Sequence, residues 1–470
     1  MTWETIVGLE IHVQLKTRTK MFCRCTAGYG ARENTQTCPV CLGFPGALPV
    51  MNRTAIEWTV KLGLALGCDI APRAVFARKN YFYPDLPKGY QISQYDMPSC
   101  ENGRMIVPMP EGDLEVGIVR AHLEEDAAKT IHMGGQTGRI GGAEYSLVDY
   151  NRGGTPLLEI VTAPDIRSAE EAKRFLQLLR QTVVELGISD AEMEKGTLRV
   201  DANVSVRPAG SDELRTRCEI KNMNSFNYIA RGIDAEVARQ IEIWEAGGEV
   251  KQETFDFDAG SGTLTPRRSK EEADDYRYFP EPDLVPVEPP AEMVERLRAE
   301  VPDSPSNRIA RLATELDLER ALVLVTGGLD ALYEATVAAG ADRIAAANVI
   351  ANNLVGAGVD PALASPVELA KLVAARDRIP RQAFDEAISK LAEPGFEAAP
   401  YIVQEAVSDA SELEPLVDRI LEENPGQVAA FRGGKEGLLG FFVGQVMKQT
   451  EGRADPRVVN ELVRAKLAGR

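Results

Sequence analysis

Four of the seven cysteines lie close together in the sequence, at a spacing typical of metal ligands. The pair Cys23 and Cys25 is followed, after twelve residues, by the pair Cys38 and Cys41. Two short pairs separated by a loop allow four thiolates to converge on one tetrahedral zinc ion. Seven is an odd count in a chain without a secretion signal, which argues against a disulfide framework. Free thiols are the alternative, but the spacing favours a structural zinc site.

A second set of reactive side chains alternates along predicted strands. Side chains two residues apart on a strand share a face, so residues 5–15 place Glu10, His12 and Gln14 together, opposite an apolar face. Two further segments repeat the pattern, with polar faces made of Arg199, Asp201, Asn203, Ser205 and Arg207, and of Arg217, Glu219 and Lys221. A half-exposed sheet is the alternative. However, these residue types are the ones that ligate metals and bind phosphates.

Three adjacent carboxylates, Glu124, Glu125 and Asp126, follow soon after His122. Such carboxylates repel one another unless a cation or a basic group holds them, and Mg²⁺ suits them because it prefers oxygen ligands. Alternation places His122 and Glu124 on the polar face of this segment and Glu125 on the apolar face. Further along, Glu159 has only apolar neighbours in residues 156–161, so it needs a partner, either a metal site or a structural arginine.

Three polar loops add groups that could bind a nucleotide or a phosphate. Residues 79–91 combine Lys79 with aromatic and amide side chains that can stack on a base. Residues 149–155, which contain Arg152, and residues 221–225, which begin with Lys221, can present backbone N–H groups and a cation to phosphate. The chain contains no P-loop or dinucleotide-binding pattern, so any ATP that it uses is held in another way.

These side chains require a sheet to position them, and the patterns along the chain predict one. Residues 1–290 mix short alternating segments with Gly, Pro and Asn breaks, whereas apolar residues recur at helical spacing from residue 291 onward. Within the first part, a helix is predicted at residues 168–187, with Ser168 as its N-cap. The Pro-rich residues 279–290 mark the boundary. The sequence therefore predicts an α+β fold, with a sheet-rich N-terminal domain followed by an all-α region.

The composition excludes several classes of protein. The 470 residues carry 53 basic and 71 acidic side chains, a formal net charge of −18, so the chain is not a generally basic nucleic-acid coat. No uncharged apolar stretch approaches the roughly 20 residues that span a membrane. We therefore expect a cytoplasmic protein of about three domains. The last 40 residues nevertheless contain eight basic and four acidic residues, which suits either a nucleic-acid backbone or a solvated helix face.

Several long motifs resemble the GatB family, which supplies one of the subunits of tRNA-dependent glutamyl/aspartyl amidotransferases. The resemblance covers essentially the whole chain and runs through residues 8–12, 79–96, 122–129, 149–162, 196–207, 219–227 and 269–283. It implies a ligase that forms C–N bonds with glutamine as the nitrogen donor. With ATP and Mg²⁺, the side-chain carboxylate of Glu-tRNA(Gln) or Asp-tRNA(Asn) would be phosphorylated, and ammonia would then displace the phosphate. Such a step needs in-line positioning and charge neutralisation.

The resemblance also implies which residues form the site. Magnesium would be held by His12, Glu125 and Glu159, with Glu10 alongside. At Glu125 the resemblance disagrees with the alternation, and we follow the resemblance because a catalytic carboxylate can lie on an otherwise apolar face. Further contacts to metal, phosphate or cofactor would come from Lys79, Arg199, Asp201, Arg152 and Lys221. The cysteine quartet occurs in only part of the family, which fits a stabilising zinc rather than a catalytic one.

The resemblance further implies domains and partners. A catalytic cradle domain (1–290) would precede a helical domain (291–405) and a small YqeY-like tail (406–470) that binds tRNA. Ammonia would come from a separate amidase (glutaminase) subunit, and a small third subunit would wrap both. Residues 132–142 are expected to form a surface hairpin. Two other functions remain as alternatives, a tRNA-binding scaffold without chemistry and a free-standing metal-dependent hydrolase.

Overall fold

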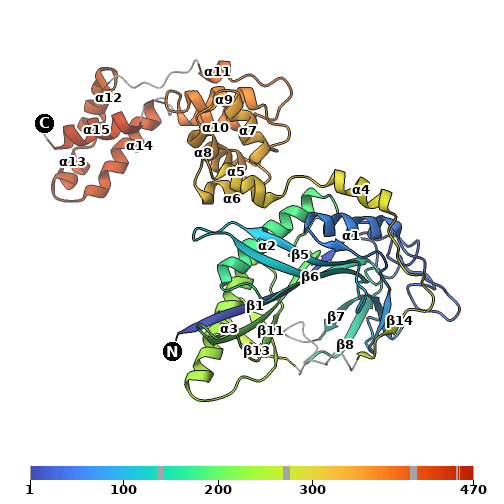
Figure 1. Ribbon diagram of the computed structural model, residues 1–470. Coiled ribbons are helices and arrows are strands. Elements are labelled where there is room, and N and C mark those ends of the chain that lie inside the picture. The colour runs from blue at the N-terminus through green and yellow to red at the C-terminus, as the bar shows by residue number, and fades with distance from the viewer. Residues whose placement is uncertain are drawn as a thin grey trace. The chain divides into compact units, whose positions relative to one another are not determined.

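The structure is a computed structural model that describes residues 2–134, 142–267, 276–402, 410–450, 454 and 456–468. The chain forms two compact units, residues 1–310 and 311–470. The first unit contains the strands and the second is helical, as Figure 1 shows. The predicted α+β class, with a sheet-rich part followed by an all-α part, is therefore confirmed. The predicted division into three domains at residues 290 and 405 stays a prediction.

A nine-stranded sheet forms the centre of the first unit. Its order is β13-β12-β11-β10-β1-β9-β6-β5-β2, and every neighbouring pair is antiparallel except β11 and β12. In that order the strands span Thr263–Pro266, Thr254–Asp258, Cys218–Lys221, Leu198–Pro208, Trp3–Gln14, Pro156–Thr162, Leu114–Glu125, Cys100–Val107 and Asp69–Ile70. The first strand in sequence, β1, thus lies in the middle of the sheet, with four strands on either side.

The two faces of β1 differ as the alternation predicts. Its apolar side chains Val7, Leu9, Ile11 and Val13 are fully buried, whereas Glu10, His12 and Gln14 are partly exposed on the other face. Three helices pack against the sheet: α1 (Arg53–Ala65), α2 (Ala169–Glu185) and α3 (Phe226–Glu245), of which α2 and α3 also pack against each other. The hydroxyl of Ser168 accepts a hydrogen bond from the Glu171 N–H at the start of α2, which confirms the predicted helix and its N-cap.

Two smaller sheets complete the first unit. One has the order β14-β3-β4, with strands Phe279–Pro280, Ala77–Asn80 and Tyr90–Ser93. The Pro-rich segment thus supplies an edge strand, the position in a sheet that tolerates proline. The other is a hairpin of β7 (Lys129–Met133) and β8 (Tyr145–Asp149). The predicted surface hairpin at residues 132–142 begins in the last two residues of β7, and its residues 135–141 are outside the described part of the chain, as are residues 268–275 of the last motif.

Helices make up the rest of the chain. α4 (Ala291–Glu300) packs against α1, and α5 (Pro305–Leu312) follows it. The next helices are α6 (Leu318–Thr326), α7 (Asp330–Ala338), α8 (Arg343–Asn348), the π-helix η2 (Val349–Leu354), α9 (Pro366–Ala375), α10 (Arg381–Ser389) and α11 (Ala399–Ile402). The last are α12 (Ala410–Glu423), α13 (Pro425–Arg432), the 3₁₀ helix η3 (Glu436–Leu438), α14 (Leu439–Gln449) and α15 (Pro456–Leu467). Helices α12, α14 and α15 share a buried apolar core that includes Val417, Phe442 and Val463.

Among the described residues, no single helix is long and apolar enough to cross a membrane. The bent pair α6 and α7, whose axes meet at 114°, reaches that length and composition only when both helices are counted together.

Candidate metal and phosphate site

Strand register gathers polar side chains from five neighbouring strands on one face of the large sheet. His12 on β1 lies opposite Glu159 on β9 and Arg199 on β10, and residues directly opposite in antiparallel strands point to the same face. The same register pairs Glu10 with Asp201 and His122 with Glu159. The predicted polar faces of residues 5–15 and 198–207 therefore form one continuous surface.

His12 lies at the centre of this surface, with three carboxylates around one ring nitrogen. Its Nε2 is 3.5 Å from Glu159 Oε2, 3.7 Å from Glu124 Oε1 and 3.7 Å from Glu10 Oε1. Glu124 and Glu159 are buried. We call His12, Glu124 and Glu159 the histidine–carboxylate cluster; Glu10 lies beside it.

The charges of the cluster shift the pKa of each member. Burial alone would lower the pKa of His12, but its hydrogen bond to Glu159 and the negative charges around it raise that pKa to about 9. Burial and the charge of Glu159 raise the pKa of Glu124 to about 7, and the same two causes raise the pKa of Glu10. Without a metal ion, the cluster thus holds protons that offset its negative charge.

The residues of the cluster fit a divalent cation. One ligand atom from each of His12, Glu124 and Glu159 lies within 4.8 Å of the other two, and the same holds for Glu10, His12 and Asp201. Ligands of Mg²⁺ at about 2.1 Å are separated by at most about 4.2 Å, so small side-chain movements would bring either set to the ion. A cation here would take over the charge neutralisation that protons provide in its absence.

Glu125 does not join the cluster. Its side chain points away from His12, where Oε1 accepts a hydrogen bond of 2.9 Å from the Ile92 N–H and pairs with the Lys88 ammonium. There it lines a cavity of about 230 Å³, together with Lys20, Phe22 and other residues of the 20–49 segment. The structure therefore places Glu124, rather than Glu125, next to His12 and Glu159. The alternation along residues 118–126 indicates the same placement, because it puts Glu124 on the polar face and Glu125 on the apolar face.

Lys79 on β3 supplies a positive charge beside the cluster. Its burial would lower its pKa, but Tyr278 and the carboxylates of Glu124 and Glu159 raise that pKa above its ordinary value, so the ammonium stays charged. Its Nζ lies 4.7 Å from the centre of the Tyr276 ring.

Arg199 and Arg152 both contact Asp126, a buried carboxylate at the end of β6. Arg199 Nη2 is 3.0 Å from Asp126 Oδ1, and Arg152 Nε is 3.7 Å from Oδ2. Arg152 also donates hydrogen bonds of 2.9 and 3.0 Å to the carbonyls of Ala127 and Ala128, so it fixes the turn after β6. Arg152 therefore lies beside Asp126 and holds the turn that follows it.

Lys221 and Asp201 form an ion pair at the other side of the surface, and Lys221 Nζ is also 3.3 Å from Glu219 Oε1. Sequence reasoning did not assign Arg120 to the site. It offered Glu124 and Asp126 only as two of three adjacent carboxylates suited to Mg²⁺, and the resemblance then favoured Glu125. Arg120 Nη2 lies 3.7 Å from Glu159 Oε1. His122 Nε2 is 3.6 Å from Glu159 Oε2, and burial lowers the pKa of His122 to about 4, so this imidazole is neutral at pH 7.

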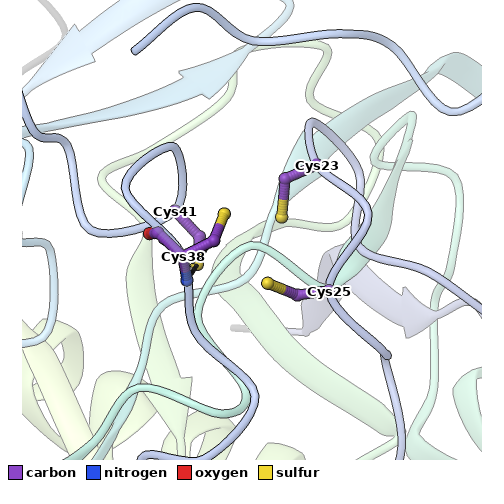
Figure 2. Close-up of side chains that lie close together, drawn as sticks. All are labelled: Cys23, Cys25, Cys38 and Cys41. Carbon is purple, nitrogen blue, oxygen red and sulfur yellow. Dashed lines mark hydrogen bonds between the residues drawn. The ribbon is translucent and has the colours of Figure 1, made fainter.

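The four cysteines of residues 23–41 converge, as the spacing predicts. Their Sγ atoms all lie within 4.8 Å of one another and point toward a common centre (Figure 2). The Sγ atoms of Cys38 and Cys41 are 3.9 Å apart, close to the separation of about 3.8 Å between ligands of a tetrahedral zinc ion with Zn–S bonds of about 2.3 Å. No pair among them is joined in a disulfide. The donor set and its geometry therefore fit zinc, and we call residues 23–41 the cysteine knuckle.

Comparison with known proteins identifies the family. The family model described as the GatB/GatE catalytic domain matches residues 5–295, and the model described as the GatB domain matches residues 331–467. The chain belongs to the GatB family. It is 46% identical over 488 residues to the B subunit of the aspartyl/glutamyl-tRNA(Asn/Gln) amidotransferase of Syntrophotalea carbinolica, covering 99% of both chains. The same protein of Geobacter sulfurreducens is 47% identical over 484 residues and is covered completely, as is this chain.

The catalytic-domain match of this GatB-family chain contains both clusters described above. One combines imidazole and carboxylate ligands with nearby Lys79 and Arg199, a set suited to bind a metal and phosphate groups. The other offers four thiolates, which are typical of a structural zinc site. The family membership predicted from the motifs is thus confirmed.

Proposed function

We propose that this chain is the component of a tRNA-dependent amidotransferase that activates and then amidates the amino acid carried by a tRNA. The proposed substrates are Glu-tRNA(Gln) and Asp-tRNA(Asn), with ATP as the phosphoryl donor and glutamine as the source of ammonia. The names of the relatives support this substrate class. The observation that carries the chemistry is the histidine–carboxylate cluster with the Lys79 and Arg199 cations beside it.

The reaction proceeds in two steps because ammonia does not displace oxide from a free carboxylate. In the first step, a side-chain carboxylate oxygen of the substrate bonds to the γ-phosphorus of ATP while the bond to ADP breaks. In the second, ammonia bonds to the acyl carbon, phosphate leaves and the nitrogen loses a proton. Both steps depend on positioning and charge neutralisation, so they need no nucleophile from the protein.

The proposed roles follow from position on the polar face. His12, Glu124 and Glu159 hold Mg²⁺, with Glu10 alongside, so Glu124 takes the role that the resemblance gave to Glu125. Bound Mg²⁺ supplies positive charge to phosphate oxygens. Lys79 and Arg199 neutralise the transferred phosphoryl group. The remaining predicted residues act at the edges of the site: Asp201 and Lys221 as an ion pair next to Glu10, and Arg152 through the turn that carries Asp126.

Further elements of the proposal concern partners and the second metal. The cysteine knuckle binds a structural zinc ion. An amidase (glutaminase) subunit produces the ammonia, and a small third subunit joins the two in a cytoplasmic heterotrimer. The domain at residues 406–470 binds the body of the tRNA, in keeping with the eight basic and four acidic residues in the last 40 positions of the chain.

The test is an amidation assay with the complex of this chain and its amidase and small subunits. The complex is supplied with glutamine, ATP, Mg²⁺ and either acylated tRNA, beside complexes that carry Glu124→Gln or Glu125→Gln. We expect amide product from the wild-type complex and none from the Glu124→Gln complex, while each of these two complexes hydrolyses glutamine. A wild-type complex with glutaminase activity but no product from either tRNA would contradict the proposal and favour the scaffold alternative. Full activity of Glu124→Gln would contradict the residue assignment alone.

A further inference from the structure

Five tyrosines form a connected row of rings beside the histidine–carboxylate cluster. Ring centroids are 5.9 Å apart for Tyr83 and Tyr81, 5.9 Å for Tyr81 and Tyr276, and 6.2 Å for Tyr276 and Tyr278. The row ends with Tyr278 and Tyr95, whose rings are stacked at 4.2 Å with planes only 8° apart. We call these residues the tyrosine row.

Hydrogen bonds fix the backbone that carries the row. The Asn80 side-chain amide donates to the carbonyls of Tyr276 and Arg277, at 3.1 and 2.9 Å. The adjacent strand β14 pairs with β3, and Arg78 on β3 donates two hydrogen bonds of 2.7 and 2.8 Å to the Glu281 carboxylate. Two segments that are about 200 residues apart in the sequence are thus held side by side, so the rings sit on a rigid support.

The row joins the protein surface to the site. Its outer rings are well exposed, with Tyr83 at 52% and Tyr95 at 45% of their full accessible area. Its middle ring, Tyr276, lies under the Lys79 ammonium, which interacts electrostatically with Glu124 and Glu159. A ligand lying along the row therefore reaches the carboxylate cluster at the row's centre.

We propose that the tyrosine row binds the unpaired bases at the 3′ end of the tRNA acceptor strand. This inference rests on the proposed function, since the acylated end must then reach the cluster. Exposed aromatic rings stack on bases whatever their identity, and successive rings accept successive bases. The exposed rings Tyr83 and Tyr95 lie at opposite ends of the row, so a single adenine cannot cover both, which favours a single-stranded end over the base of ATP. Because the chain carries a net charge of −18, its overall charge does not attract RNA. Local stacking therefore has to supply the free energy of binding.

The test measures binding of a short single-stranded RNA that ends in CCA, labelled with a fluorophore at its 5′ end, to the full chain by fluorescence anisotropy. Tyr95→Leu and Tyr83→Leu remove an exposed ring but keep an apolar side chain. Each is expected to weaken binding by about tenfold or more, because stacking contributes substantially per base. Tyr95→Phe, which keeps the ring, is expected to bind like the wild type. Tyr145→Leu, at a similarly exposed tyrosine on β8, serves as the control and is expected to bind normally.

ATP affinity, measured by calorimetry on the same variants, distinguishes binding of the RNA bases from binding of the adenine of ATP. Unchanged ATP binding with weakened RNA binding supports the proposal. Weakened ATP binding with normal RNA binding would contradict it and make adenine the occupant, and normal binding of both by Tyr95→Leu and Tyr83→Leu would leave the row without a base ligand. Row-dependent RNA binding by a complex that forms no amide would contradict the proposed function while this inference stands.

Discussion

Among its described residues, the first unit contains the histidine–carboxylate cluster and the cysteine knuckle, two groups of side chains that could hold a metal ion, and they are assembled in different ways. The histidine–carboxylate cluster stands on three adjacent strands, β1, β9 and β6, whose hydrogen-bonded register determines which side chains meet. The cysteine knuckle is built from loops, in which turns such as the Leu42 N–H to Cys38 carbonyl bond set the geometry. Strand register fixes a site without its ligand, whereas loops of this kind depend on the bound metal for much of their stability. The cluster should therefore serve chemistry and the knuckle stability.

The most direct way to break this comparison is to remove a ligand of the histidine–carboxylate cluster. His12→Ala is expected to lower ATP-dependent amidation by at least about 100-fold, because electrostatic stabilisation of the reacting groups is lost. Above pH 9, where the ring is no longer protonated, the midpoint of thermal unfolding should change little, since the ring lies outside the apolar core. Gln14→Ala, on the same face of the same strand, is the control and should remain active. Comparable activity of the two variants would show that the cluster has no catalytic role.

Loss of the metal from the cysteine knuckle should instead affect thermal stability more than amidation. The wild-type chain is expected to contain one zinc ion, and Cys25→Ser to contain none and to unfold at least about 5 °C lower, because structural zinc is coupled to folding. Cys218→Ala should keep its zinc, since Cys218 lies on β11 and contacts Arg239 rather than the knuckle. Metal content by mass spectrometry and unfolding by calorimetry provide the readouts. A stable, zinc-free wild type would mean that the thiols serve another purpose.

Sequence patterns predicted the parts of both groups that depend on local periodicity. Alternation placed Glu10 and His12 on the polar face of β1, and the paired spacing brought four cysteines together. Neither pattern says which strand lies next to which. Glu159 lies next to both His12 and His122 because β9 lies between β1 and β6 in the sheet. That strand order depends on the whole fold.

The choice between Glu124 and Glu125 illustrates the same limit. Local alternation favoured Glu124 for the polar face, whereas the family resemblance favoured its neighbour. The structure shows why the two carboxylates differ. The Glu125 carboxylate lies on the other side of β6, where it binds the Lys88 ammonium and the Ile92 N–H. Those partners come from β4 and the loop before it, which periodicity along residues 118–126 cannot reveal.

A smaller effect is expected on the pH dependence of stability. In metal-free protein the pKa of His12 is about 9, above its ordinary value near 6.5, so the protonated ring stabilises the fold below pH 6.5 and that contribution is lost as pH rises through 9. Urea unfolding in a chelator should thus show stability falling over this range. Saturating Mg²⁺ should flatten the dependence, because it binds the neutral ring. His12→Gln in chelator should lack the slope, and a wild-type slope in that variant would assign it to another group.

The smallest expected effect tests whether the two groups are independent. Asn34, inside the knuckle, receives a hydrogen bond of 2.8 Å from the Tyr150 N–H and donates its side-chain amide to the Val148 carbonyl at 3.1 Å. The same loop continues to Arg152, which fixes the turn beside Asp126. Asn34→Ala should therefore keep its zinc and lower amidation only a few-fold, because it removes two exposed hydrogen bonds, each worth about 1 kcal/mol, that reach the site only through the loop.

The control for this last substitution is Thr35→Ala, whose hydroxyl bonds only within the knuckle, to the Arg32 carbonyl at 2.6 Å. Both variants perturb the knuckle, but only Asn34→Ala removes hydrogen bonds to the loop that leads to Arg152. Equal activities would mean that the knuckle stabilises the unit as a whole without positioning the site. A lower activity of Asn34→Ala alone, at equal zinc content, would mean that the cysteine knuckle helps to hold the turn next to the histidine–carboxylate cluster.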